Sequence, residues 1–234
     1  MTNSIQFELM ELFPSPLMKH LWLDSDELNE ELNHLILSKE KEHHGISTTN
    51  VGGWHSKKDF QTWDGECVKV LLSRMLILGQ EMMKKFYDSS EQELLADWTI
   101  QAWANINRNG QYNKFHTHIR NLNLWSGVYY VSTGTEETDN VQSARIIFAD
   151  QHRVEPMSRK EFRRRYSVEP QSGLMLLFPS SLGHRVEPHL GTGDRITIAF
   201  NLKNSRFSTI NYEIEKNNVG KSLPIDDSRF SEKM

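Results

Sequence analysis

The sequence contains a single cysteine, Cys67, so no disulfide can form within the chain. Proteins without disulfides are typical of a reducing compartment. No apolar stretch reaches the roughly 18 residues that a transmembrane helix requires, so no membrane association is expected. The first residues also lack the basic segment and apolar run of a secretory signal, and the expected location is the cytoplasm.

An excess of basic charge is missing as well. The formal net charge is −4 at pH 7, whereas general nucleic-acid binders carry a strongly basic surface. Nucleic acid is therefore not an expected partner, and we interpret the one dense basic run, residues 159–165, as a solvated segment. Apolar residues form 37% of the 234 residues, which is enough to build a core in one domain with elaborations.

The spacing of apolar residues changes its period near residue 97. Upstream, residues 5–22 are interpreted as an extended segment, residues 25–41 and 65–88 have helical spacing, and residues 43–63 are loop-like. Downstream, short alternating or apolar runs between turn residues predict the strands of a sandwich or barrel. These runs are residues 97–105, 127–131, 144–148, 173–179 and 195–201.

The expected fold is mainly β with flanking helices, in one domain. Residues 1–96 would supply an N-terminal strand or loop and packing helices. Residues 97–203 would form the β core, and residues 204–234 a polar C-terminal segment. The oligomeric state is not predicted.

Two of the ten histidines stand two positions apart, as His116 and His118. In a strand, residues i and i+2 project from one face, and two imidazoles there can bind one metal ion such as iron, zinc, copper or nickel. Two partly exposed histidines at a strand end are the alternative interpretation. His184 follows an apolar strand and a turn, and it is the candidate for a third ligand.

Arg195 begins an otherwise apolar alternating strand, in which Thr197 and Ala199 share its face. Burying an unpaired guanidinium is costly. We therefore expect Arg195 either to pair bidentately with the carboxylate of a ligand or to lie at the surface beside Asp194 or Glu187. The pattern of this strand alone leaves both possibilities open.

The order of these motifs resembles the 2-oxoglutarate–Fe(II) oxygenase superfamily. The resemblance is strongest to a family of oxygenases in which a histidine pair precedes three further motifs, and it covers about residues 48–203. The corresponding segments here are Ser126–Val131, Phe178–His184 and Arg195–Asn201, with Asn50–Ser56 and Trp103–Asn105 upstream.

This resemblance implies a double-stranded β-helix, that is, a jelly-roll or cupin-like barrel, with Fe(II) and 2-oxoglutarate in its mouth. It implies a dioxygenase, which is an oxidoreductase that uses dioxygen to oxidise its substrate. We expect the oxidation to be a hydroxylation, and the sequence does not identify the substrate. The implied metal ligands and catalytic residues are His116, His118 and His184. The implied cosubstrate-binding residues are Arg195, at the distal carboxylate, with Tyr130 and Thr197. The implied substrate-side residues are Trp54, His55, Trp103 and Asn105, with core packing as the alternative for the two tryptophans.

One position departs from the commonest pattern of that superfamily. Residue 118 is His, where most members have the Asp or Glu of a two-histidine–one-carboxylate triad. We favour the interpretation in which three imidazoles bind the iron. In the alternative interpretation, a carboxylate such as Asp150 takes the place of His118 as a ligand.

Two different functions are also compatible with the histidines. The spacing of Gly173, Pro179 and His184 resembles the second motif of cupins, which can bind metal without 2-oxoglutarate. A non-catalytic binding module, in which the histidines only stabilise a loop, is the third candidate. Only the oxygenase requires Arg195 together with Thr197.

Overall fold

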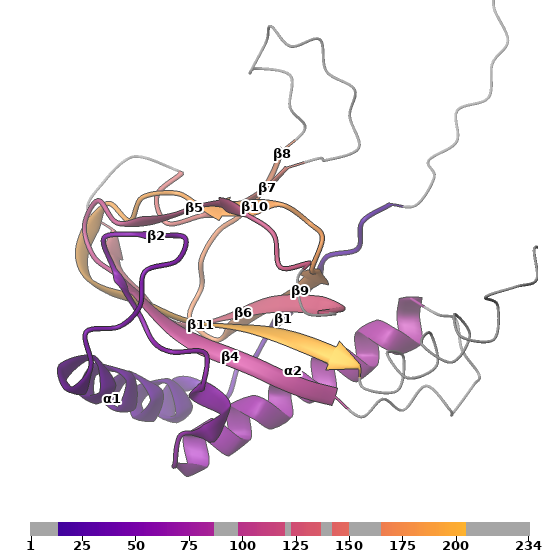
Figure 1. Ribbon diagram of the computed structural model, residues 1–234, viewed down its shortest axis with the longest axis horizontal. Helices are drawn as coiled ribbons and strands as arrows, with labels where there is room; N and C mark the ends of the chain where they lie inside the picture. The colour runs from indigo at the N-terminus through magenta and orange to yellow at the C-terminus, as the bar shows by residue number, and fades with distance from the viewer. Residues whose placement is uncertain (1–13, 87–97, 120–122, 137–141, 150–164, 205–234) are drawn as a thin grey trace, which may run out of the picture.

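The computed structural model describes residues 14–86, 98–119, 123–136, 142–149 and 165–204. Two antiparallel sheets lie in layers, and two helices cover one of them (Figure 1). The first sheet has the order β1 (Met18–Leu21), β9 (Leu174–Pro179), β6 (Trp125–Glu136), β11 (Gly191–Asn204), β4 (Trp98–Asn107) and β3 (Trp54–His55). The second has the order β2 (Asn50–Val51), β5 (Tyr112–His116), β10 (His184–Val186), β7 (Ile146–Ala149) and β8 (Arg165–Val168).

The two helices lie on the face of the six-stranded sheet that is turned away from the five-stranded sheet (Figure 1). They are α1 (Asp26–Glu42) and α2 (Glu66–Phe86), close to the predicted 25–41 and 65–88. Asp26 and Glu27 occupy the first turn of α1, where negative charge is favoured by the helix dipole. Among the described helices, none combines the length and apolar character needed to cross a membrane.

The six-stranded sheet buries both of its faces, and the side chains alternate between them. Tyr129 and Ile198 pack in the cluster that includes the buried faces of α1 and α2. Val128 and Tyr130 pack toward the five-stranded sheet, in a cluster with Ile146 and others of its residues. Alternation with period two, which the sequence predicted, therefore decides which residues face the helices and which face the space between the sheets.

The segment predicted as a loop, residues 43–63, contains regular structure, so that prediction was wrong in part. It forms β2, β3 and the short 3-10 helix η1 (Phe60–Thr62). In β3, Trp54 pairs with Ile106 and His55 with Asn105 of β4. A two-residue strand has no periodicity of its own, and it forms here because the edge of β4 offers backbone partners.

The short strands of the second sheet were only partly predicted. The sequence did not indicate β8 or β10, because each has three or four residues and pairs with distant segments. β5 ends at His116, so His118 lies just beyond the strand rather than on its face as predicted. Asp150, residues 159–164 of the basic run and residues 205–234 lie outside the described residues, while Arg165 begins β8.

Candidate metal centre and adjoining cavity

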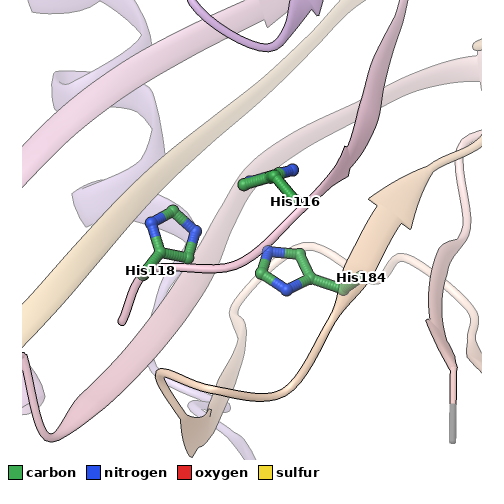
Figure 2. A group of neighbouring side chains, drawn as sticks. All are labelled: His116, His118 and His184. Atoms are coloured by element: carbon green, nitrogen blue, oxygen red, sulfur yellow. The ribbon is translucent and has the colours of Figure 1, made fainter. Parts of the chain in front are cut away.

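Three histidines meet at the end of the five-stranded sheet. The antiparallel register places His184 directly opposite His116, a position in which side chains of neighbouring strands touch. His118 is held close by its backbone N–H, which donates to the carbonyl of Ser180 at 2.8 Å. The three rings point toward one another (Figure 2), and one nitrogen of each lies within 4.8 Å of the others.

Hydrogen bonds orient two of these rings. His116 Nδ1 lies 2.7 Å from the carbonyl oxygen of Lys114, and His184 Nδ1 lies 2.9 Å from that of Leu182. A carbonyl only accepts, so each Nδ1 carries the proton and each Nε2 keeps its lone pair for a metal. A compact set of three imidazole nitrogens suits divalent iron, as well as zinc, copper or nickel, so these residues fit the metal that the resemblance implies.

All three imidazoles are neutral at pH 7. Burial lowers the pKa of His116, that of His118 to about 2 and that of His184 to about 3. The neighbouring histidines lower the pKa of His118 and His184 further. A metal ion can therefore bind the cluster near neutral pH without first displacing a proton from it.

The depressed pKa values predict that the metal-free protein loses stability in acid. The unfolded chain takes up protons on its histidines below about pH 6.5, whereas His184 in the folded protein does not until near pH 3. The contribution of His184 to the free energy of unfolding is therefore fully present above pH 6.5. Below pH 6.5 it falls by roughly 1 kcal/mol per pH unit. Urea denaturation between pH 7 and pH 5 should show a shallower loss in His184→Asn than in wild type. Identical pH slopes of stability in the two proteins would contradict this prediction.

A cavity of about 160 Å³ adjoins the three histidines. Its floor is the inner face of the six-stranded sheet, where Arg195, Thr197 and Ala199 of β11 line it together. The register places Thr197 beside Tyr130 of β6, which lines the same cavity. The sequence predicted that these three residues of β11 share a face, and that prediction is confirmed.

Arg195 is buried at the floor of this cavity, with 2% of its surface exposed. Its Nη1 donates to Asn107 Oδ1 at 3.2 Å, while its Nε and the hydroxyl of Tyr130 have no hydrogen-bond partner among the described residues. The guanidinium carbon lies 5.4 Å from the centroid of the Tyr130 ring. Burial lowers the pKa of Arg195 and raises that of Tyr130.

Neither acidic neighbour in the sequence pairs with Arg195. Asp194 accepts from Arg108 at 2.9 Å, and Glu187 accepts from Arg185. The interpretation of Arg195 as a surface residue is therefore wrong. Unpaired buried donors are rare and costly, and a guanidinium that lines a cavity beside an unpaired hydroxyl fits the carboxylate of a ligand. The residues present thus also fit 2-oxoglutarate.

The predicted substrate-side residues separate into two groups. His55, Trp103 and Asn105 line the cavity, and the ring of Trp103 lies 5.6 Å from that of His118. Trp54 does not line it. Its indole is buried in the core, and its Nε1 donates to the carbonyl of His43 at 2.8 Å.

Among the residues that sequence reasoning missed are a partner of Arg195 and a lysine that lines the cavity. Asn107, the partner of Arg195, stands on the same face of β4 as Asn105 and Trp103, so alternation along that strand could have indicated it. Lys58 also lines the cavity. No signal in the sequence distinguishes Lys58 from its neighbour Lys57, because the local backbone conformation decides which of the two lysines lines the cavity.

The family described as "Putative 2OG-Fe(II) oxygenase" matches residues 101–201. The match covers less than half of the chain, and this part is similar to the 2-oxoglutarate–Fe(II) oxygenases. The matched region begins within β4 and ends within β11, so it contains the three histidines, Tyr130, Arg195 and Thr197. Activity of this family depends on Fe(II) and 2-oxoglutarate, and it consumes dioxygen and a substrate.

Solved structures of oxygenases share the fold of this chain, that is, the two sheets and their flanking helices. A prolyl-4-hydroxylase from Pseudomonas putida is 14% identical over 80% of this chain and 92% of its own, with a TM-score of 0.57. The carbocyclase SnoK of nogalamycin biosynthesis is 11% identical over 82% and 80%, with a TM-score of 0.59. HygX from Streptomyces hygroscopicus, solved with nickel, 2-oxoglutarate and hygromycin B, is 11% identical over 82% and 84%, with a TM-score of 0.53.

These structures confirm the predicted double-stranded β-helix with flanking helices. At such low identities the likeness extends to the fold alone, and the three proteins act on unlike molecules according to their descriptions. A comparison with curated proteins finds no match.

Proposed function

We propose that the oxygenase domain holds Fe(II) with His116, His118 and His184 and binds the distal carboxylate of 2-oxoglutarate with Arg195. The observation that carries this proposal is the position of a buried guanidinium with an unpaired Nε in the cavity that the three imidazoles adjoin. An uncompensated buried cation is costly, and a dianionic cosubstrate compensates it. Neither a cupin-like enzyme nor a non-catalytic module accounts for such a group.

Bound Fe(II) supplies the activation of dioxygen, with 2-oxoglutarate as the electron donor that is converted to succinate and carbon dioxide. The residues of this chain bind and orient. Arg195 presents a planar fork that matches a carboxylate, and Tyr130 and Thr197 add hydroxyl groups on the same face of the sheet. Phe178, which packs against His184 at a ring distance of 4.9 Å, keeps bulk water from that side of the metal site.

The ligand set has no carboxylate. The described residues that line the cavity include no Asp or Glu, and a site of three neutral imidazoles carries one more positive charge than the two-histidine–one-carboxylate triad. That difference favours anionic ligands at the metal and is consistent with bidentate chelation by a 2-oxo acid. We propose that the oxidation is a hydroxylation.

The location we propose is the cytoplasm, on the basis of the single cysteine, which is buried in α2. Dioxygen and an unidentified organic substrate are the expected reactants. The negative net charge of the chain argues against nucleic acid as the substrate.

Anaerobic titration of the Fe(II)-loaded protein with 2-oxoglutarate tests this function. Chelation of Fe(II) by the 2-keto and 1-carboxylate oxygens should produce a metal-to-ligand charge-transfer band that saturates at one equivalent. Succinate lacks the keto oxygen and should produce no band, which makes it the matched control. Binding of iron without a band at saturating 2-oxoglutarate would contradict the oxygenase assignment and favour a cupin-like site.

A further inference from the structure

A lysine stands at the opening of the cavity, above an aromatic ring. Lys58 Nζ lies 4.6 Å from the centroid of the Trp103 ring, within the distance at which a cation and an aromatic face attract. Trp103 is itself fixed between His55, whose ring stacks on it at 5.7 Å and an angle of 7°, and His118. Lys58 is exposed although it lines the cavity, so it marks the side open to solvent.

Lys58 has no acidic partner among the residues that the structure describes. None of the cavity-lining residues that the structure describes is acidic, and the ion pairs of the described residues do not include Lys58. The loss of solvation beside the cavity lowers its pKa, and its charge in turn lowers the pKa of His55, His116 and His118. Within the described part of the chain, this positive charge near the metal ligands therefore has no acidic partner.

Two cationic side chains, Arg195 and Lys58, thus line the cavity together with the three neutral histidines. In the proposed function, one carboxylate of 2-oxoglutarate binds Fe(II) and the other pairs with Arg195, so the cosubstrate has no carboxylate left for Lys58. Arg195 lies at the floor beside Tyr130, whereas Lys58 lies over Trp103, whose ring neighbours those of His55 and His118. Arg195 serves the distal carboxylate of the cosubstrate, so the anion opposite Lys58 must belong to another molecule.

We propose that Lys58 and Trp103 form a substrate subsite for an anionic group, so that the substrate of this oxygenase carries a carboxylate or phosphate. Trp103 lines the cavity beside Lys58 and would contact the apolar part of the substrate next to that group. His55 Nδ1 lies 2.6 Å from the carbonyl oxygen of Ser56 and carries the proton, which leaves Nε2 free to accept a hydrogen bond from the substrate. This inference rests on the proposed function, because it takes the floor of the cavity as the cosubstrate site.

Matched probes test the charge preference of this subsite. Benzoate and benzamide have the same shape and differ in charge, and phenyl phosphate distinguishes the two anions. Each would be titrated calorimetrically into the anaerobic Fe(II) protein saturated with 2-oxoglutarate, so that the cosubstrate site is already filled. Benzoate or phenyl phosphate should bind at least about tenfold more tightly than benzamide, because an added charge-assisted hydrogen bond contributes about that factor.

Two lysine variants separate the subsite from general surface charge. Lys58→Gln should reduce the preference for the anions to about threefold or less, while Lys57→Gln, which removes the same charge from an exposed neighbour, should leave it unchanged. A higher salt concentration should weaken the anions and not benzamide. The more tightly bound of benzoate and phenyl phosphate identifies the anionic group.

Several outcomes would overturn the subsite. Equal binding of benzoate, phenyl phosphate and benzamide in wild type, or a preference that survives in Lys58→Gln, means that Lys58 does not select the substrate. A rise in the dissociation constant of 2-oxoglutarate in Lys58→Gln as large as in Arg195→Ala assigns the lysine to the cosubstrate instead. A charge-transfer band without anion preference refutes this inference alone, whereas absence of the band refutes the proposed function together with it.

Discussion

Replacing Arg195 with alanine is expected to raise the dissociation constant for 2-oxoglutarate by about 30-fold or more, with the affinity for Fe(II) unchanged. Removing one partner of a buried charge-assisted pair costs on the order of 2–5 kcal/mol of binding, and each 1.4 kcal/mol corresponds to about tenfold. Arg195 has no other anionic partner among the described residues. The measurement is the anaerobic charge-transfer titration, with iron affinity determined separately in the absence of 2-oxoglutarate.

Two further variants make the Arg195 experiment specific. Arg195→Lys keeps the charge and most of the volume and should recover only part of the affinity, because an ammonium cannot reproduce the fork of the guanidinium. Arg145→Ala removes an arginine that pairs with the exposed Glu169 outside the cavity, and it should bind 2-oxoglutarate like wild type. If all three variants matched wild type, Arg195 would not bind the cosubstrate.

Replacing His184 with alanine should weaken Fe(II) binding by more than about 100-fold. Loss of a residue that only orients a metal ligand typically costs 10- to 100-fold, and His184 is proposed as a ligand itself. Its Nδ1 is engaged by the carbonyl of Leu182, so its Nε2 is the nitrogen that the alanine variant would lose as a ligand. Competition with a chromogenic chelator under anaerobic conditions would measure the affinity, and folding of the variant would be checked by thermal unfolding.

Variants at His118 decide whether the third ligand is an imidazole. His118→Ala should weaken iron binding comparably to His184→Ala, whereas His34→Ala, at an exposed position of α1, should leave it unchanged. His118→Asp would create the more common carboxylate ligand and should retain iron, while it lowers the positive charge of the site. Wild-type iron affinity in His118→Ala would exclude His118 as a ligand, and the carboxylate alternative would then have to be sought elsewhere in the chain.

Periodicity in the sequence predicted the features that local residue patterns control. Helical spacing located α1 and α2 within two residues at each end, because each helix buries one continuous apolar stripe. Alternation placed Arg195, Thr197 and Ala199 on one face of β11, because successive side chains of a strand point to opposite faces. These are properties of single elements, and they do not depend on what lies next to them.

Pairing between distant segments had to be decided by the tertiary structure. β3 and β10 are too short to show a period, and their places follow from backbone partners on β4, β5 and β7. The same pairings bring His184 opposite His116 and orient His55 beside Asn105.

The sequence by itself determined the residue types of the site and their order along the chain, and it indicated a barrel core with a metal-binding histidine pair. It did not determine whether Arg195 was buried or exposed, whether Trp54 or Lys58 reached the cavity, or whether His118 stood near His184. Each of those depends on contacts between residues far apart in the chain, and their free energies arise only when the sheets pack together. The folded structure therefore decided which charges are left unpaired, and the proposed functions of Arg195 and Lys58 both follow from that.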